Sequence, residues 1–221
     1  MAFSRSSKGR LTPRDAARFP SSTLFDRLAR AVCEAGCLPR KELYEAWEVA
    51  RRARRLFRGG RIVDLACGHG LLAHVMLLLD DSSAKAVAAD KVIPRSSASV
   101  HEAIVRAWPR LEGRIRFLEE DIDDITLSAA DVVVSSHACG NLTDRILERA
   151  AKAKARVAVL PCCHDAGRGD SGGLTGWMDG ALAIDAVRAL RLRDRGYRVW
   201  TQTIPADITG KNRLLLGRPG A

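Results

Sequence analysis

From residue 61 onward, short and mostly apolar runs alternate with longer stretches in which apolar residues recur at helical spacing. This alternation is typical of a parallel sheet covered by helices on both faces. The last two runs are joined by a turn too short for a crossover helix, so they must pair antiparallel. We predict strands at residues 62–66, 86–89, 115–118, 132–134, 157–160, 197–204 and 213–217, and helices at 71–79, 97–108, 142–153 and 177–193.

The N-terminal quarter has a different pattern. Residues 1–20 lack hydrophobic periodicity and contain two prolines, so we expect a disordered basic tail there. Two amphipathic helices follow, one from about residue 24 to Gly36 and one over residues 40–57. The predicted organisation is a tail over residues 1–20, an N-terminal helical cap over 21–60 and a main domain over 61–221.

Charge is concentrated in the same quarter, since residues 1–60 hold 14 Lys/Arg against 6 Asp/Glu in a chain of net charge +10. The basic helices either attract a phosphate backbone such as RNA or only keep the surface soluble. Aromatic residues are 5% of the 221, too few for a platform that stacks several bases. There is neither an apolar run of membrane length nor a secretory signal, so we expect a cytoplasmic protein with reduced thiols and no membrane partner. The oligomeric state stays open.

The first strand leads into a glycine-containing loop, Asp-Leu-Ala-Cys-Gly-His-Gly over residues 64–70. Glycines there let the backbone approach a ligand, and the helix that follows offers free N–H groups. Residues 68–73 match the dinucleotide fingerprint G-x-G-x-x-A, with Asp90 about 20 residues further on. Asp64 argues against a dinucleotide, because a carboxylate in the strand repels a pyrophosphate and suits a cationic group.

The acidic residue, the glycine loop and the reversed final strand together resemble class I S-adenosylmethionine-dependent methyltransferases. The resemblance implies a Rossmann-like α/β fold, with two N-terminal helices before a seven-stranded, mostly parallel sheet whose last strand is reversed. Ala66 stands where that family has its first glycine. The family holds ribose with an acid at the position of Asp90 and adenine near that of Asp121. The cofactor-binding residues it implies are Asp64, Ala66, Cys67, Gly68, Gly70, Asp90, Lys91, Asp121, Ile122 and Ser136.

Histidines and cysteines follow the fourth and fifth strands, in Ser-Ser-His-Ala-Cys-Gly-Asn-Leu-Thr-Asp (135–144) and Leu-Pro-Cys-Cys-His-Asp (160–165). Neighbouring strand ends meet at one edge of a sheet, so these side chains should converge. The strings are similar to the methyltransferase subgroup that includes glutathione-S-transferase C-terminal-domain-containing protein, and more distantly to the tRNA 2′-O-methyltransferase of the Trm-thirteen type. We predict His137 and His164 as catalytic residues, oriented by Asp144 or Asp165, and substrate contacts from Cys139, Asn141, Pro161, Cys162 and Cys163.

Three roles compete for this cluster: a histidine that takes a proton from the acceptor, a zinc site that activates a thiol acceptor, and cysteines that only fill tight turns. The ligand spacing differs from the usual Cys-x₂-Cys pairs, so no metal is predicted. The expected function is methyl transfer from S-adenosylmethionine, with RNA (tRNA or rRNA) as one candidate acceptor. A small-molecule or protein acceptor, a non-catalytic S-adenosylmethionine-binding protein and an NAD-dependent oxidoreductase are the alternatives.

Overall fold

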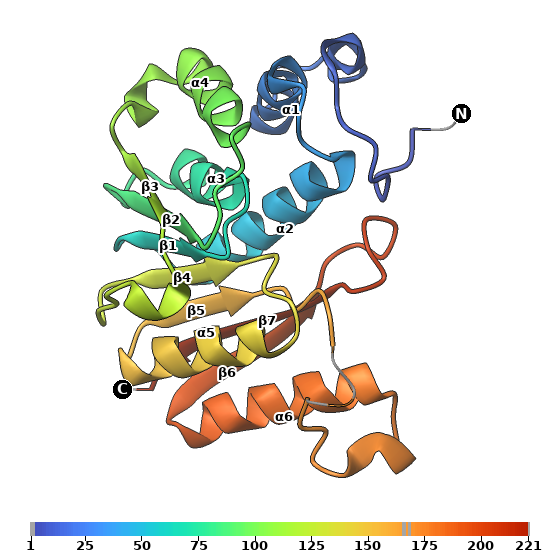
Figure 1. Cartoon of the computed structure of the whole chain (residues 1–221), viewed down its shortest axis with the longest axis vertical. Coiled ribbons are helices and arrows are strands. Elements are labelled where there is room, and N and C mark those ends of the chain that lie inside the picture. The colour runs from blue at the N-terminus through green and yellow to red at the C-terminus, as the bar shows by residue number, and fades with distance from the viewer. Residues whose placement is uncertain (1–2, 165–166, 168, 221) are drawn as a thin grey trace.

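The computed structural model describes residues 3–164, 167 and 169–220. Seven strands form one sheet in the order β3-β2-β1-β4-β5-β7-β6, and β7 runs antiparallel to both β5 and β6. The predicted seven-stranded sheet with a reversed last strand is therefore confirmed (Figure 1). The strands are β1 (Ile62–Leu65), β2 (Ala86–Asp90), β3 (Ile115–Glu119), β4 (Val132–Ser135), β5 (Arg156–Val159), β6 (Tyr197–Thr203) and β7 (Arg213–Pro219).

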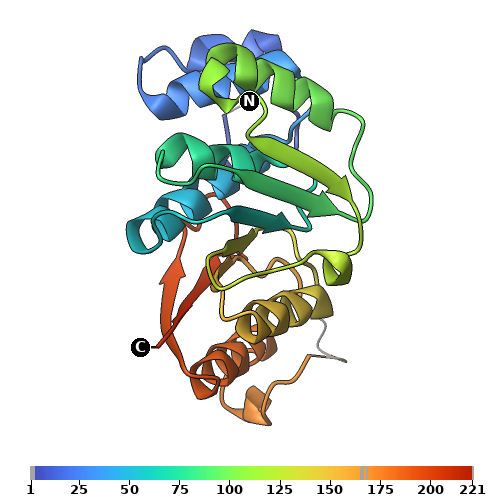
Figure 2. The same ribbon diagram turned by 90° about the vertical axis from the view of Figure 1, so that its left-hand side faces the viewer.

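Helices cover both faces of the sheet, as the apolar strands require. In Figures 1 and 2, α2, α3 and α4 lie over one face, whereas α5 and α6 lie over the other. No helix of the described residues is long and apolar enough to cross a membrane. The helices are α1 (Leu24–Ala35), α2 (Arg40–Leu56), α3 (Leu71–Leu79), α4 (Ser97–Ala107), α5 (Asn141–Lys152) and α6 (Gly180–Asp194).

Alternation along the strands supplies two apolar cores. Ile62 and Val134 belong to the core shared with α1–α4, whereas Val63 and Val133 belong to the core shared with α5. This is the period-2 pattern of a strand buried on both faces. Asp64 lies two residues after Ile62 on the same strand, so its side chain points to the same face of the sheet, the face covered by α3.

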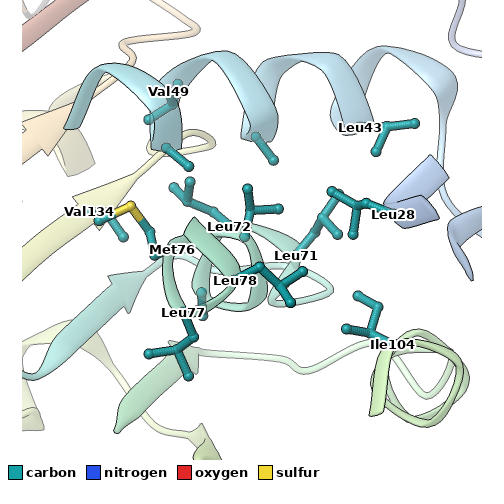
Figure 3. Close-up of a cluster of buried hydrophobic side chains, with 14 of the residues drawn as sticks. Leu28, Leu43, Val49, Leu71, Leu72, Met76, Leu77, Leu78, Ile104 and Val134 are labelled. Carbon is teal, nitrogen blue, oxygen red and sulfur yellow. The ribbon is translucent and has the colours of Figure 1, made fainter. Parts of the chain in front are cut away.

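The two N-terminal helices belong to the same core as the sheet. Leu43 and Val49 of α2 face Leu71, Leu72 and Met76 of α3 in the close-up of Figure 3. Because these side chains form one continuous cluster with strand residues, α1 and α2 complete a layer of the sandwich. The first turn of α2 therefore lies at the same edge of the sheet as the first turn of α3.

Residues 3–20 are ordered, which corrects the expectation of a disordered tail. Leu11 is fully buried, its N–H donates to the carbonyl of Leu38 at 2.9 Å, and Arg10 pairs with Pro39 in an isolated bridge. A 3₁₀ helix over Pro13–Arg18 packs beside α1. The buried residues of this segment follow no regular period, and their partners are distant in sequence, so local patterning does not register them.

Replacing Leu11 by Ala should lower the free energy of unfolding by about 2–4 kcal/mol, because a fully buried leucine leaves a cavity. Leu190→Ala is the matched control: that side chain is 42% exposed, and its loss should cost less than about 0.5 kcal/mol. Urea unfolding followed by circular dichroism measures both. Equal, small effects would mean that residues 3–20 do not dock on the helices in solution.

Candidate active site at the carboxyl ends of the strands

The loop between β1 and α3 turns through left-handed backbone conformations. Ala66, Gly68 and Gly70 have φ of 55°, 53° and 70°. A Cβ at Gly70 would lie 2.6 Å from Cε1 of Phe117, so only glycine fits there. A Cβ at Gly68 would meet no atom within 4 Å, so the loop faces open space at that point. Ala66 holds its conformation at a cost of about 1 kcal/mol, which the family's glycine would avoid.

Asp90, at the end of β2, holds this loop from the side. Its Oδ2 accepts a hydrogen bond from the N–H of Gly68 at 2.8 Å, and the N–H of Cys67 donates to the carbonyl of Ala89 at 3.1 Å. The hydrogen bonds of the described residues leave Oδ1 of Asp90 without a partner. The half-buried carboxylate can therefore fix the loop and accept from a ligand hydroxyl together.

Asp64 lies beneath the loop and is 1% exposed. Its Oδ2 accepts from the N–H of Ala73 at 3.1 Å, near the start of α3, where the helix dipole favours negative charge. Burial, together with the charge of the neighbouring Asp90, raises the pKa of Asp64 to about 8, although the hydrogen bond from Ala73 opposes the shift. An ionised Asp64 thus has no positively charged partner within the described protein, and a cationic ligand group at the loop would stabilise its negative charge.

The remaining predicted cofactor residues occupy different environments. Asp121 accepts from the N–H of Asp123 at 3.1 Å and from Nη2 of Arg145 at 2.7 Å, and these contacts lower its pKa. Ile122 is buried in the core on the α5 side, Ser136 is buried and Lys91 is exposed. The structure therefore gathers Asp64, Ala66, Cys67, Gly68, Gly70 and Asp90 around one loop, whereas Asp121 is already engaged in an ion pair with α5.

A pocket of about 400 Å³ lies at the same edge of the sheet. Three distant parts of the chain form it: the N-terminal segment with the start of α2, the ends of β4 and β5, and the β6–β7 connection, which lies beside the N-terminal segment in Figure 1. It contains His137, Cys162 and Cys163, three of the residues expected to converge at the strand ends. The complete lining is Lys8, Pro39, Lys41, Glu42, Glu45, His137, Cys162, Cys163 and Lys211.

The sequence does not predict the N-terminal part of this lining, because the packing of α2 on α3 and of residues 3–20 on the start of α2 brings it here. Lys41 pairs with Glu45 at 3.2 Å. Burial, with the charge of Glu45, raises the pKa of Glu42 to about 7. Burial and nearby Lys41 lower the pKa of His137. At neutral pH the pocket therefore combines an uncharged imidazole with an excess of positive charge.

His164 does not line this pocket, contrary to the prediction. Its Nε2 lies 2.8 Å from Oδ1 of Asp185 on α6, and Arg213 donates to the other oxygen of that carboxylate at 2.7 Å. Asp144, one predicted orienting acid, pairs instead with Arg188 at 2.7 Å. Asp165, the other, lies outside the described residues. The sequence marks His164 as a strand-end histidine but gives no sign of its partner 21 residues downstream.

Two further predicted substrate residues also lie elsewhere. Asn141 is exposed at the start of α5, and Pro161 lines a separate pocket beside α6. Cys139 is exposed, and its Sγ lies 3.0 Å from that of Cys162. His137, Cys139, Cys162 and Cys163 are thus the predicted residues that the structure brings together.

A family model described as a methyltransferase domain matches residues 42–167. A curated relative, a glutathione S-transferase C-terminal domain-containing protein homolog of Drosophila pseudoobscura pseudoobscura, is 26% identical over 200 aligned residues. That alignment covers 72% of this chain and 33% of the relative, so the chain spans about a third of its length.

Solved structures share the fold. An O-methyltransferase family protein from Burkholderia thailandensis superposes with a TM-score of 0.55 at 19% identity, over 96% of this chain and 64% of that one. Human N-acetylserotonin methyltransferase, in complex with S-adenosylmethionine, gives a TM-score of 0.50 at 20% identity, over 94% and 65%. At these identities the likeness shows the fold alone.

The Asp64→Asn variant should lose a pH dependence of stability. The folded pKa of about 8 exceeds the unfolded value of about 3.9, so the folded protein binds this proton more tightly than the unfolded chain does. The free energy of unfolding that the proton contributes is therefore lost as the pH rises from about 4 towards 8. Relative to Asp64→Asn, the parent should lose about 2–4 kcal/mol of unfolding free energy between pH 5 and 8. Urea titrations across that range measure it.

Asp194→Asn, at an exposed carboxylate on the last residue of α6, is the matched control and should follow the parent at every pH. Parallel pH profiles for the parent and Asp64→Asn would contradict the raised pKa.

Proposed function

The chain belongs to the methyltransferase-domain family matched over residues 42–167, and we propose that it methylates RNA with S-adenosylmethionine as donor. The observation that carries the proposal is the left-handed loop beside Asp90 and over buried Asp64, with a basic pocket at the same sheet edge. S-adenosylmethionine, when bound, supplies an electrophilic methyl group on a sulfonium. The protein has to hold that donor and align an acceptor with it.

Each side of the loop suits one part of the donor. The unpartnered Oδ1 of Asp90 is suited to the ribose hydroxyls, and the open space over Gly68 lets a ligand approach the backbone. Buried Asp64 favours the cationic methionine portion. Asp121 would reach the adenine amino group with the oxygen that Arg145 does not contact.

His137 is the residue that we propose for the acceptor step. It lines the pocket, and burial together with nearby Lys41 lowers the pKa of its imidazole, which keeps the ring neutral and able to accept a proton. Its position suits removal of a proton from the acceptor as the methyl group arrives. Alignment supplies most of the rate in such a transfer, so His137 also acts by positioning.

Positive charge at the mouth of the site supports RNA as the acceptor. Lys8, Lys41 and Lys211 line the pocket, Arg10 is adjacent and exposed, and Lys91 and Arg95 follow β2 at the same edge. A rim of basic side chains attracts the phosphate groups of an RNA backbone.

The arginine cluster of residues 51–58, which belongs to the basic helices considered above for RNA binding, lies at the other end of α2, roughly 20 Å from the pocket along the helix. Arg51 and Arg52 pair with Glu48, and Arg54 and Arg58 pair with Asp80. These ion pairs neutralise much of the cluster's positive charge within the protein. The rim therefore carries the proposal, and the cluster does not.

The dinucleotide alternative has less support. β7 lies between β5 and β6 and runs antiparallel to both, which is foreign to a simple dinucleotide-binding sheet. The N–H of Gly68 already donates to Asp90, so that donor of the loop is not free for a phosphate. The family match points to methyl transfer as well.

Two variants should separate donor binding from transfer. Asp90→Ala should weaken S-adenosylhomocysteine binding by about 10–100-fold, because it removes a charged acceptor. His137→Gln should keep the affinity but slow labelled-methyl transfer by about 10–100-fold. Isothermal titration and transfer into RNA, protein and metabolite fractions of cell extract measure the two effects.

Tight NAD binding in place of S-adenosylhomocysteine would contradict the donor. Label in the protein or metabolite fraction alone would contradict the RNA acceptor. Unchanged turnover in His137→Gln would remove that residue from the mechanism.

Salt dependence tests the basic rim. Replacing Lys8 and Arg10 together by Ala should weaken binding of total tRNA or rRNA and reduce the slope of log affinity against log salt by about 2. Arg51 and Arg55 replaced together by Ala make the charge-matched control at the far end of α2, and should leave the slope unchanged. Equal slopes for both double variants would refute the rim as the RNA contact.

A further inference from the structure

Three cysteines from two strand ends form one thiol cluster. The Sγ atoms of Cys139, Cys162 and Cys163 all lie within 4.8 Å of one another. Backbone contacts hold the two loops together, since Cys139 pairs with Cys163 in a parallel bridge and the N–H of Gly140 donates to the Cys163 carbonyl at 3.1 Å. Cys139 is exposed and the other two are half-buried, so their role is not that of core cysteines such as Cys33.

A buried arginine supports the loop that carries Cys139. Arg188 is 3% exposed, and its Nη2 donates to the carbonyl of Gly140 at 3.0 Å while the same guanidinium pairs with Asp144. Gly140 has φ 59° and ψ −129°, a conformation open essentially to glycine. The thiols are therefore held on a preorganised loop, as a binding site requires.

We propose that Cys139, Cys162 and Cys163 bind a Zn²⁺ ion through three thiolates, with the fourth ligand position open to the pocket. Zinc takes thiolates at about 2.3 Å in tetrahedral geometry, which puts the sulfurs about 3.8 Å apart. The separations here are close to that value: 3.0 Å for the Cys139–Cys162 pair, and no more than 4.8 Å for any pair of the cluster.

The open position follows from the ligand count. Within residues 3–164, 167 and 169–220, no fourth His, Cys, Asp or Glu joins the cluster. Structural zinc sites are closed by four protein ligands, whereas three protein ligands leave a place for water or substrate. Cys162 and Cys163 line the pocket, so this place faces it.

Charge at the site suits a bound zinc thiolate. Zinc binding releases the thiol protons to solvent, and three thiolates with one divalent ion leave a single negative charge. The ammonium of Lys211 lies 3.6 Å from Sγ of Cys163 and offsets that charge. The metal site itself is independent of the acceptor, whereas contact between the open position and an acceptor atom rests on the proposed function.

Metal content and a cobalt spectrum test the site on the full chain, purified under reducing conditions. The parent should hold stoichiometric zinc by mass spectrometry, and Co²⁺ in its place should give thiolate charge-transfer bands and tetrahedral ligand-field bands. Each of Cys139→Ser, Cys162→Ser and Cys163→Ser should lower the zinc affinity by about 100-fold or more, and Lys211→Met by about 10-fold. Cys37→Ser, at a half-buried cysteine outside the cluster, should bind as the parent does.

Circular dichroism of each variant checks the fold, and alkylation of the parent's thiols before cobalt addition repeats the test without a substitution. Folded, reduced parent that binds no zinc, or zinc retained in all three serine variants, would overturn the proposal. So would a Cys139–Cys162 disulfide found in place of metal. Zinc is measured without acceptor or donor, so bound zinc in a protein that transfers no methyl group would refute the proposed function and leave the metal site intact.

Discussion

A strained loop held between two carboxylates is the constraint on which the site depends. Ala66, Gly68 and Gly70 adopt left-handed backbone conformations, with Asp90 bonded to the loop and Asp64 buried beneath it. In this arrangement the loop and the start of α3 face the same ligand-binding space. The side chains of Asp64 and Asp90 lie close together where water has little access. Stability is given up at this point for an electrostatic environment that favours a cationic ligand.

The rest of the molecule is organised around the edge where that loop lies. Packing of α2 on α3 brings Lys41, Glu42 and Glu45 to the strand ends, and the β6–β7 connection brings Lys211 from the opposite side. Residues 3–20 cover the start of α2, so Lys8 also reaches the pocket. Donor-side and acceptor-side residues thus come from separate parts of the chain, and the core that joins them fixes their spacing.

The sequence alone predicts the sheet because strands buried on both faces give apolar runs, and glycines mark the loop that begins α3. It also predicts that His137 and three cysteines meet, since β4 and β5 are neighbours. It does not predict the burial of Leu11, the pairing of His164 with Asp185, or the lysines of the pocket. Those depend on contacts between distant segments, for which local periodicity contains no signal.

A crystal structure with S-adenosylhomocysteine tests the central claim most directly. The account predicts the ribose hydroxyls at Oδ1 of Asp90, the nucleoside over Gly68, and the homocysteine amino group on the Asp64 side of the loop. A nucleoside bound at another edge of the sheet, with Asp90 and Gly68 untouched, would contradict it.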